Sequence, residues 1–302
     1  MQNTETCQKT SISTLLKKIG RACLPNKLVQ KLKGSDVRIP VIRLSGVIGA
    51  ASALRKGLDY ASMQPHIEKA FKTRKAKAIA LIINSPGGSP AQSHLIAKRI
   101  RELAEEKKLP VYAFVEDVAA SGGYMLACAA DEIYADPTSI LGSIGVVSSG
   151  FGFTGLIEKI GIERRVHTAG KNKAILDPFL PEKAEDIERL KDLQKEIHEF
   201  FISFVRKQRN DKLKEDFDDL FTGAFWVGDA LRQRGLIDGF GSVHSVLKEK
   251  YGDDLKLIPV QNEKKSLLSF ILGGSGTSLS LGSSRELLET LEEHSIWNRY
   301  GL

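Results

Sequence analysis

Cysteine is scarce in this chain. Three cysteines, Cys7, Cys23 and Cys128, are scattered over 302 residues. They are too few and too far apart for a disulfide framework or a zinc site, which fits a reducing compartment. We therefore expect a fold that is held together by its core, with no metal and no cofactor.

Long apolar runs are also missing. The longest ones, such as Ala78–Ile83, are far shorter than the roughly 20 residues that a membrane-spanning helix needs. The first residues contain no secretory signal with an A-x-A site. These two absences predict a cytoplasmic location.

Positive charge is in excess, with a formal net charge of +7, and much of it lies near the N-terminus. Residues 1–36 form a basic arm in which leucine and isoleucine recur near helical spacing. We expect an amphipathic helix in peripheral contact with the inner face of a membrane. A solvated arm, or a helix that packs on a neighbouring subunit, explains the pattern equally well. No aromatic residues interleave with the basic ones and no binding motif is present, so we expect no nucleic acid partner.

From Val37 onward, strand patterns alternate with helix patterns. Such alternation implies right-handed crossovers and a largely parallel sheet, which is the α/β class. The predicted strands are 37–49 (one or two), 76–85, 109–116 and 131–136, followed by a strand-like stretch at 163–169. The predicted helices are 59–73, 91–108 and 181–209, the last with Pro181 in its first turn.

Composition divides the chain into three parts. Residues 37–260 form the α/β domain, between the basic arm and a polar tail at 261–302. Within the tail, 273–284 is rich in glycine and serine and reads as a linker, and 285–296 reads as a final helix.

Ser121 lies between two alanines and two glycines in the stretch "VAASGGYMLACAA". A serine at this point is commonly a helix N-cap. However, the glycine pairs 87–88 and 122–123 each follow an apolar strand, and such loops converge at the carboxyl ends of a parallel sheet. Their N–H groups suit an oxyanion hole, although tight turns without a catalytic task explain the glycines as well.

A nucleophilic serine needs a base. Of the six histidines, His94 is the most plausible, but none has a neighbouring acid in a triad setting. Lys171 and Lys173 lie in the loop "HTAGKNKAILDPF", and a buried uncharged lysine can serve as a base. The spacing alone does not select between these two lysines.

The chain resembles the SppA-type signal peptide peptidases, which are serine proteases on the ClpP/crotonase fold of repeated β-β-α units. The resemblance runs from about Val41 to Val260. It rests on the segments "VIRLSGVIG", "INSPGGS", "VAASGGYMLACAADEIYADPTSILGSIGVV", "TAGKNKAILDPF" and "FTGAFWVGDALRQRGLIDGFGS", which occur in the order of the family.

This resemblance implies the roles of six site residues and one bystander. Ser121 is the nucleophile, and Lys173 is the base because it matches the family's G-x-x-K loop, which leaves Lys171 as the bystander. Ser143 in the "GSIG" turn holds the lysine. The oxyanion donors are the N–H groups of Gly88 and Gly122, and Gly87 shapes the turn.

The resemblance also implies substrates and assembly. We expect cleavage of hydrophobic or unstructured peptides, such as the remnants of signal sequences. A single copy of the fold implies a homo-oligomer, a ring or dome, in which Lys173 completes the site around Ser121 of a neighbouring subunit. Two other readings are a protease-like scaffold associated with a membrane and an acyl-CoA enzyme of the crotonase type, which needs carboxylate bases.

Overall fold

The computed structural model describes residues 37–49, 58–214, 216–261 and 294–302. These residues belong to one compact unit, Val37–Leu302. The basic arm at 1–36 and the linker at 273–284 lie outside the described residues, as do residues 285–293 of the final predicted helix. Residues 294–298 of the C-terminal part are helical.

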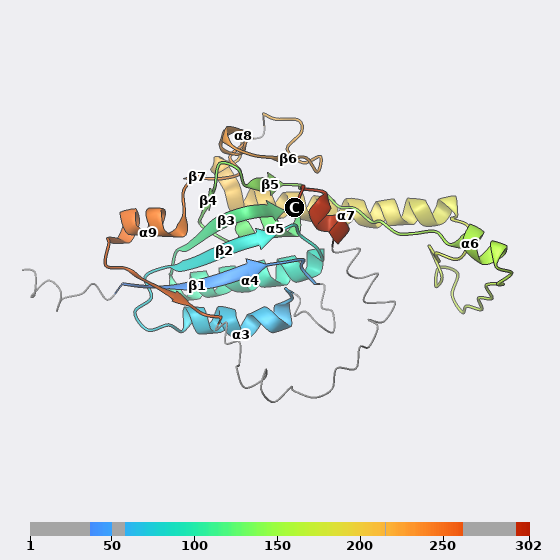
Figure 1. The fold of residues 1–302 in the computed structure, drawn as a ribbon, viewed down its shortest axis with the longest axis horizontal. Helices are drawn as coiled ribbons and strands as arrows, with labels where there is room; N and C mark the ends of the chain where they lie inside the picture. Colours follow the sequence, from blue (N-terminus) through green and yellow to red (C-terminus); the bar gives the residue numbers. More distant parts are fainter. Residues whose placement is uncertain (1–36, 50–57, 215, 262–293) are drawn as a thin grey trace, which may run out of the picture. The chain divides into compact units, whose positions relative to one another are not determined.

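The core of the unit is a sheet with the strand order β6-β5-β3-β2-β1-β8, to which β4 adds beside β3 and β7 beside β4 (Figure 1). All pairs are parallel except β5 with β6, which confirms the predicted α/β class with a largely parallel sheet. The strands are β1 Arg38–Ser45, β2 Ile79–Ser85, β3 Val111–Ala120, β4 Glu132–Ala135, β5 Ile140–Gly142, β6 Phe225–Trp226, β7 Gly239–Phe240 and β8 Lys256–Pro259.

Helices cover both faces of the sheet, as the nearly continuous apolar strands predict. Alternate residues of β1, β2 and β3 pack with α3, α4, α5 and the C-terminal part of α7 on one face, and with α9 on the other. The helices are α3 Tyr60–Phe71, α4 Pro90–Lys107, α5 Gly122–Ala127, α6 Thr154–Lys159, α7 Ala184–Arg209, α8 Asp229–Gln233 and α9 Val243–Tyr251.

Strand β3 is longer than the predicted strand 109–116 and ends directly before Ser121. Its first half pairs with β4 and its second half with β5, so one strand serves two neighbours. Asp117, Ala119 and Ala120 hid this extension, because aspartate and alanine carry little strand propensity of their own.

Two other predictions are wrong. Residues 163–169 do not form a strand; they are largely exposed and pair with no described strand, and an extended segment without a partner leaves its backbone groups to water. Pro181 does not lie in the first turn of α7, which begins at Ala184. The N–H groups of Phe179 and Leu180 bond to Asp177, so a separate turn precedes the helix.

Candidate active site

Ser121 has a strained backbone at the junction of β3 and α5. Its φ is 52° and its ψ is −122°, a conformation that residues with a side chain rarely adopt. The backbone is held there from both sides, because the Ser121 N–H donates to the Gly142 carbonyl at 2.8 Å and the Ser121 carbonyl accepts from Tyr124 N–H at 2.9 Å. The side chain makes no capping hydrogen bond, so Ser121 does not act as a conventional N-cap.

The helix that follows Ser121 is buried along its whole length. The Tyr124 hydroxyl donates to the Leu236 carbonyl at 2.9 Å, which ties α5 to the segment after α8. Burial raises the pKa of the neighbouring Cys128 thiol to about 12, so this cysteine is an inert core residue. The serine therefore stands on a rigid support.

The Gly87–Gly88 turn contacts the serine directly. A Cβ atom on Gly87 would lie 2.8 Å from the Cβ of Ser121, and one on Gly88 would lie 2.2 Å from the Ile48 carbonyl oxygen. A Cβ atom on Gly122 would lie 2.3 Å from the Ser93 hydroxyl oxygen. Only glycine fits these three positions without a clash, because Gly87 and Gly88 pack against backbone atoms and Gly122 packs against the side chain of Ser93.

Two backbone donors are available beside the serine. Within the described residues, the hydrogen-bond pattern gives no acceptor to the N–H of Gly88 or of Gly122. Gly122 directly follows Ser121, and Gly88 directly follows the glycine that touches it. Two such N–H groups can stabilise the negative charge on an oxygen formed at the serine.

Ser143 lies one residue beyond the carbonyl that holds Ser121. It is half-buried, has a φ of 53°, and donates its N–H to the Ala224 carbonyl at 2.6 Å. The structure therefore brings Gly87, Ser121 and Gly122 together, with Ser143 on the adjoining turn.

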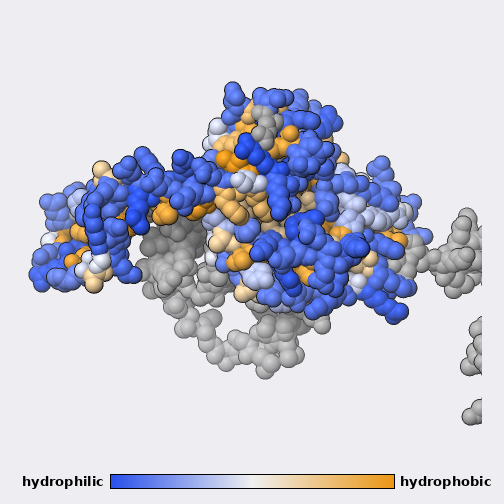
Figure 2. Space-filling model, turned by 180° about the vertical axis from the view of Figure 1, so that it is seen from behind, coloured by the Kyte–Doolittle hydropathy of each residue, from blue (hydrophilic) through white to orange (hydrophobic). Residues whose placement is uncertain are grey.

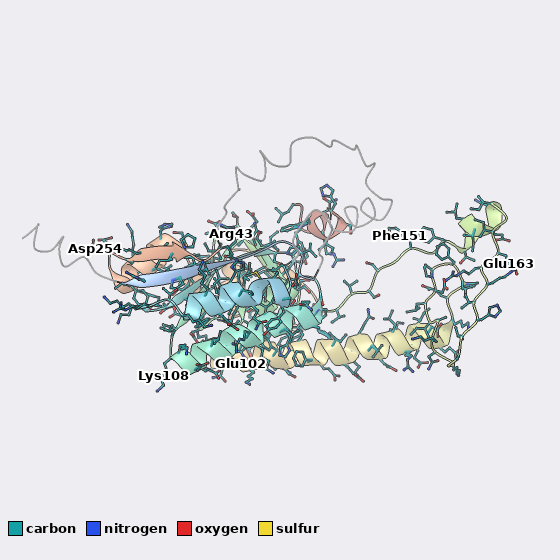
Figure 3. All side chains as sticks on the ribbon, turned by 90° about the horizontal axis from the view of Figure 1, so that it is seen from below. Arg43, Glu102, Lys108, Phe151, Glu163 and Asp254 are labelled. Atoms are coloured by element: carbon teal, nitrogen blue, oxygen red, sulfur yellow. The ribbon has the colours of Figure 1, made fainter. Side chains whose placement is uncertain are left out.

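Lys173 is in a different part of the chain. It belongs to the lysine segment, residues 146–183, which leaves the sheet after β5 and ends at the start of α7. Figures 1 and 3 show this segment, with α6 and the labelled Glu163, beside the N-terminal end of α7. The C-terminal end of that helix packs near α5, and its 26 residues span about 39 Å. One chain alone does not bring Lys173 to Ser121.

The side chain of Lys173 is exposed, and no hydrogen bond or ion pair holds it within the described part of the chain. Its N–H donates to the Gly170 carbonyl at 3.2 Å. Lys171 faces Glu185 across 3.6 Å in an exposed ion pair. Both lysines stand on the surface of their own chain.

Two of the histidines, His94 and His198, make packing or backbone contacts that join other elements to α7. His94 packs edge-on against Phe200 and Phe204 of α7. Burial, and then the charge of Lys98, lower its pKa. The Nε2 atom of His198 lies 3.0 Å from the Ile144 carbonyl oxygen.

Two buried serines of the site escaped the sequence analysis. Ser85 donates its hydroxyl to the Gly46 carbonyl at 2.7 Å and accepts the Gly87 N–H at 3.2 Å, which fixes the glycine turn. Ser93 donates to the Ser89 carbonyl at 2.8 Å and lies against Gly122. A buried strand that ends in serine before Pro-Gly-Gly was the available signal for the first of them. Among the described residues there is no cluster of three or more metal-ligating side chains.

The sequence matches one protein family over its central part and individual proteins over most of its length. Residues 103–254, which include Ser121 and Lys173, match the family described as Peptidase family S49. The chloroplastic serine protease SPPA of Arabidopsis thaliana is 33% identical over 279 residues, which cover 88% of this chain and 40% of that protein. A protein of Enterococcus faecium named as a signal peptide peptidase SppA is 30% identical over 252 residues, or 79% of this chain and 71% of that protein.

A protein of Brucella abortus with the name Na(+)/H(+) antiporter NhaA is 50% identical over 288 residues, which cover 92% of this chain. This chain spans 39% of the length of that relative. None of the helices among the described residues combines the length and the apolar character that crossing a membrane requires.

Among solved structures, the chain resembles a mutant of the 1510-N membrane-bound stomatin-specific protease with a substrate peptide, at a TM-score of 0.47 and 16% identity. That match covers 78% of this chain and 97% of the other. The S49 match spans half of the sequence, and the relative from Enterococcus faecium is matched over more than two thirds of its length. The chain therefore belongs to peptidase family S49, the SppA-type serine peptidases.

Proposed function

We propose that this protein is a serine endopeptidase of the SppA type, with Ser121 as nucleophile and Lys173 of a neighbouring subunit as general base. The observation that carries the proposal is the strained Ser121 backbone, held between the Gly142 carbonyl and the buried α5. Strain of this kind persists only where the surrounding structure imposes it, and it clusters at catalytic centres.

The exposure of Lys173 supports a site that two subunits share. A lysine base must be uncharged, and water stabilises the ammonium form of an exposed amine. A neighbouring subunit that covers the lysine segment would remove that water. Large apolar side chains are exposed along the same segment: Val147, Phe151, Leu156, Ile160 and Ile162. Figure 2 shows apolar surface among the polar residues at this end of the molecule, at the left of the view.

Such exposed apolar residues are typical of a surface that a partner covers. A second copy of the chain that packs on this segment buries these side chains. Lys173 of the first copy then lies toward Ser121 of the second copy. The homo-oligomer that we predict from the single copy of the fold would provide this second copy.

The reaction then runs in two steps. Lys173 takes the proton from the Ser121 hydroxyl while its oxygen attacks the peptide carbonyl carbon, and the oxyanion receives hydrogen bonds from the N–H groups of Gly88 and Gly122. The C–N bond breaks, and Lys173 returns the proton to the leaving amine. Water then hydrolyses the acyl-enzyme. The hydroxyl of Ser143 accepts a hydrogen bond from the amine and keeps it aimed at Ser121.

The substrates that we propose are hydrophobic or unstructured peptides, such as cleaved signal peptides. Apolar residues near the site, including Phe225 and Val227, are exposed enough to contact them. A peripheral contact of the basic arm with the inner face of a membrane would bring the enzyme to such peptides.

A fluorophosphonate probe tests the catalytic pair. We expect the probe to label the wild-type protein and Lys171→Ala, but not Ser121→Ala or Lys173→Ala. Lys171 is the matched control because it lies two residues from Lys173 in the same exposed loop. Loss of labelling in Lys171→Ala with retention in Lys173→Ala would contradict the assignment of the base.

Mixing two inactive variants tests whether the site is shared. When Ser121→Ala and Lys173→Ala subunits are dissociated and reassembled together, some sites combine an intact Ser121 with an intact Lys173. We expect peptidase activity to reappear in the mixture. A mixture that stays as inactive as each variant alone, although sizing shows mixed oligomers, would mean that each chain builds its site from its own residues.

A further inference from the structure

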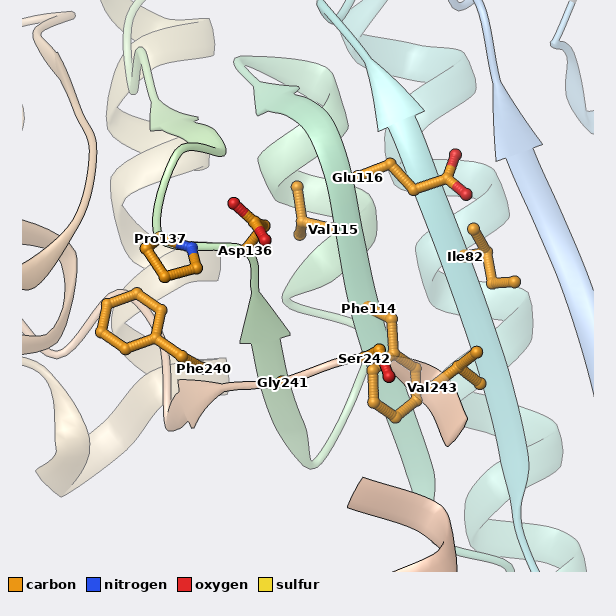
Figure 4. A pocket seen from close by; sticks show the side chains of 10 residues that line it. All are labelled: Ile82, Phe114, Val115, Glu116, Asp136, Pro137, Phe240, Gly241, Ser242 and Val243. Carbon is orange, nitrogen blue, oxygen red and sulfur yellow. The ribbon is translucent and has the colours of Figure 1, made fainter. Parts of the chain in front are cut away.

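A cavity of about 450 Å³ lies on the face of the sheet that packs against α9, away from Ser121 and its glycine turn (Figure 4). Its apolar walls come from β2, β3, β7 and the start of α9. They include Ile82, Phe114 and Val243. No part of the proposed catalytic mechanism uses this cavity.

The charged groups of the cavity are both acidic. Glu116 and Asp136 line it together with the apolar residues, and no lysine or arginine is among the lining residues. Arg43 of β1, which lies on the far side of β2, balances Glu116 through two hydrogen bonds of 2.7 and 2.8 Å. Asp136 pairs with no cation in the described structure; hydrogen bonds from the Thr138 side chain and backbone lower the pKa of its carboxyl. The cavity therefore carries a net negative charge beside apolar walls.

The cavity and the serine are joined along one face of β3. Successive residues of a strand point to opposite faces, so Phe114, Glu116, Val118 and Ala120 share one face and lead to Ser121. Phe114 and Glu116 line the cavity, whereas Trp297 and Tyr300 pack over Val118 and Ala120. Trp297 is only half-buried, so it offers an apolar surface between the cavity and the serine.

An extended peptide can span the distance along β3 from Ser121 to the cavity. From Ser121 back to Glu116 and Phe114, β3 rises by about 16 to 23 Å, and a peptide strand needs about five to seven residues for the same span. A signal peptide has a positively charged region directly before its apolar region. A peptide cleaved within its apolar region thus carries its basic side chains at about this distance on the N-terminal side.

We propose that this cavity is a distal subsite that binds a basic residue at the start of the apolar stretch of a peptide substrate. The inference rests on the proposed function. The ammonium group meets the carboxylate of Asp136, the aliphatic stem packs between Phe114 and Val243, and the apolar residues that follow cross Trp297 toward Ser121. The subsite thereby sets the register of cleavage.

Binding to the full-length Ser121→Ala protein tests the subsite without turnover. The ligands are fluorescent apolar peptides in which a single lysine is moved along the sequence or replaced by norleucine, and the readout is anisotropy. We expect one lysine position to bind about fivefold more tightly than norleucine, an advantage that weakens with salt. Asp136→Asn should abolish this advantage and leave the norleucine peptide unaffected.

Two further variants complete the test. Glu249→Gln removes an exposed acid of α9 outside the cavity and should leave the lysine preference unchanged. Val243→Trp fills the cavity and should weaken the lysine peptide more than the norleucine peptide. The inference is overturned if no lysine position is preferred, or if the preference survives both Asp136→Asn and Val243→Trp while thermal melting shows both variants folded.

The proposed function fails independently of this result. Fluorophosphonate labelling of wild-type Ser121 does not depend on the cavity. A labelled enzyme without lysine preference would refute the subsite alone, and a lysine preference in a protein that never labels would refute the peptidase proposal alone.

Discussion

The serine end of the sheet and the lysine segment differ in almost every physical respect. Around Ser121 the backbone is crowded, α5 is buried, and glycine is the only residue that fits at positions 87, 88 and 122. Around Lys173 the chain is exposed, and a Cβ atom on Gly170 would meet nothing within 4 Å.

This contrast shows that the two halves of the proposed site are held in place in different ways. The fold of one chain prepares the nucleophile and its two N–H donors, because core packing fixes them. The base lies on a segment that the same chain leaves uncovered, so its surroundings depend on what packs against it. Perturbing each region should therefore have unequal effects.

The largest effect is expected at the buried charge beneath α5. Arg209 is 1% exposed; it donates to the Gly235 carbonyl and pairs with Asp238 at 2.8 Å. Arg209→Ala removes one of the two cations that lie 2.8 Å from the half-buried Asp238, the other being Lys212, and leaves the Gly235 carbonyl without both guanidinium donors. We expect a loss of about 3–5 kcal/mol in unfolding free energy, measured by urea denaturation. A loss below about 1 kcal/mol would show that α5 does not depend on this anchor.

Two glycine substitutions compare the regions directly. Both Gly88 and Gly170 have positive φ, at 143° and 105°. Gly88→Ala adds a clash with backbone atoms of Ile48, so it should cost about 3 kcal/mol or more and abolish probe labelling. Gly170→Ala adds backbone strain alone and should cost about 1 kcal/mol. If thermal melting showed the same loss of stability for Gly88→Ala and Gly170→Ala, the claim that the serine end is the more crowded region would be refuted.

Acid should weaken the serine end through Asp238. Burial raises the pKa of this carboxyl, but the hydrogen bond and charge of Arg209, with Lys212, outweigh burial and lower it overall. A lowered folded pKa contributes stability above the unfolded value of about 3.9, and this contribution is lost as the pH falls through the folded pKa. We expect the unfolding free energy of the wild type to fall below about pH 5.

Asp238→Asn is the control for this pH dependence. The variant should be less stable than the wild type at neutral pH, and the difference between the two proteins should shrink as the pH falls. Parallel stability curves for both proteins from neutral to acidic pH would assign the acid sensitivity to other carboxyl groups.

The smallest effect is expected in the lysine segment. Lys171 and Glu185 form an ion pair in which both side chains are mostly exposed. Lys171→Ala should change the unfolding free energy by less than about 0.5 kcal/mol, because water and salt screen such pairs. A larger loss would mean that this segment is more firmly held than its exposure indicates.

The sequence by itself determined the α/β class, the parallel sheet and the order of most elements. Apolar runs such as that of β2 need cover on both faces, and the crossover helices supply it. It also singled out Ser121, because a hydroxyl between two alanines and two glycines, directly before an apolar stretch, is visible in the pattern. Likewise, the glycine pairs predicted accessible N–H groups at the carboxyl ends of the strands.

Only the tertiary structure decided how these residues lie relative to one another. The positive φ of Ser121 and its bond to the Gly142 carbonyl depend on β5, which is distant from the glycine turn in sequence. The cavity between β2, β3 and the start of α9 has no local signature at all. Whether Lys173 lies near Ser121 depends on the path of α7, because residue spacing fixes local periodicity but not where a long helix points.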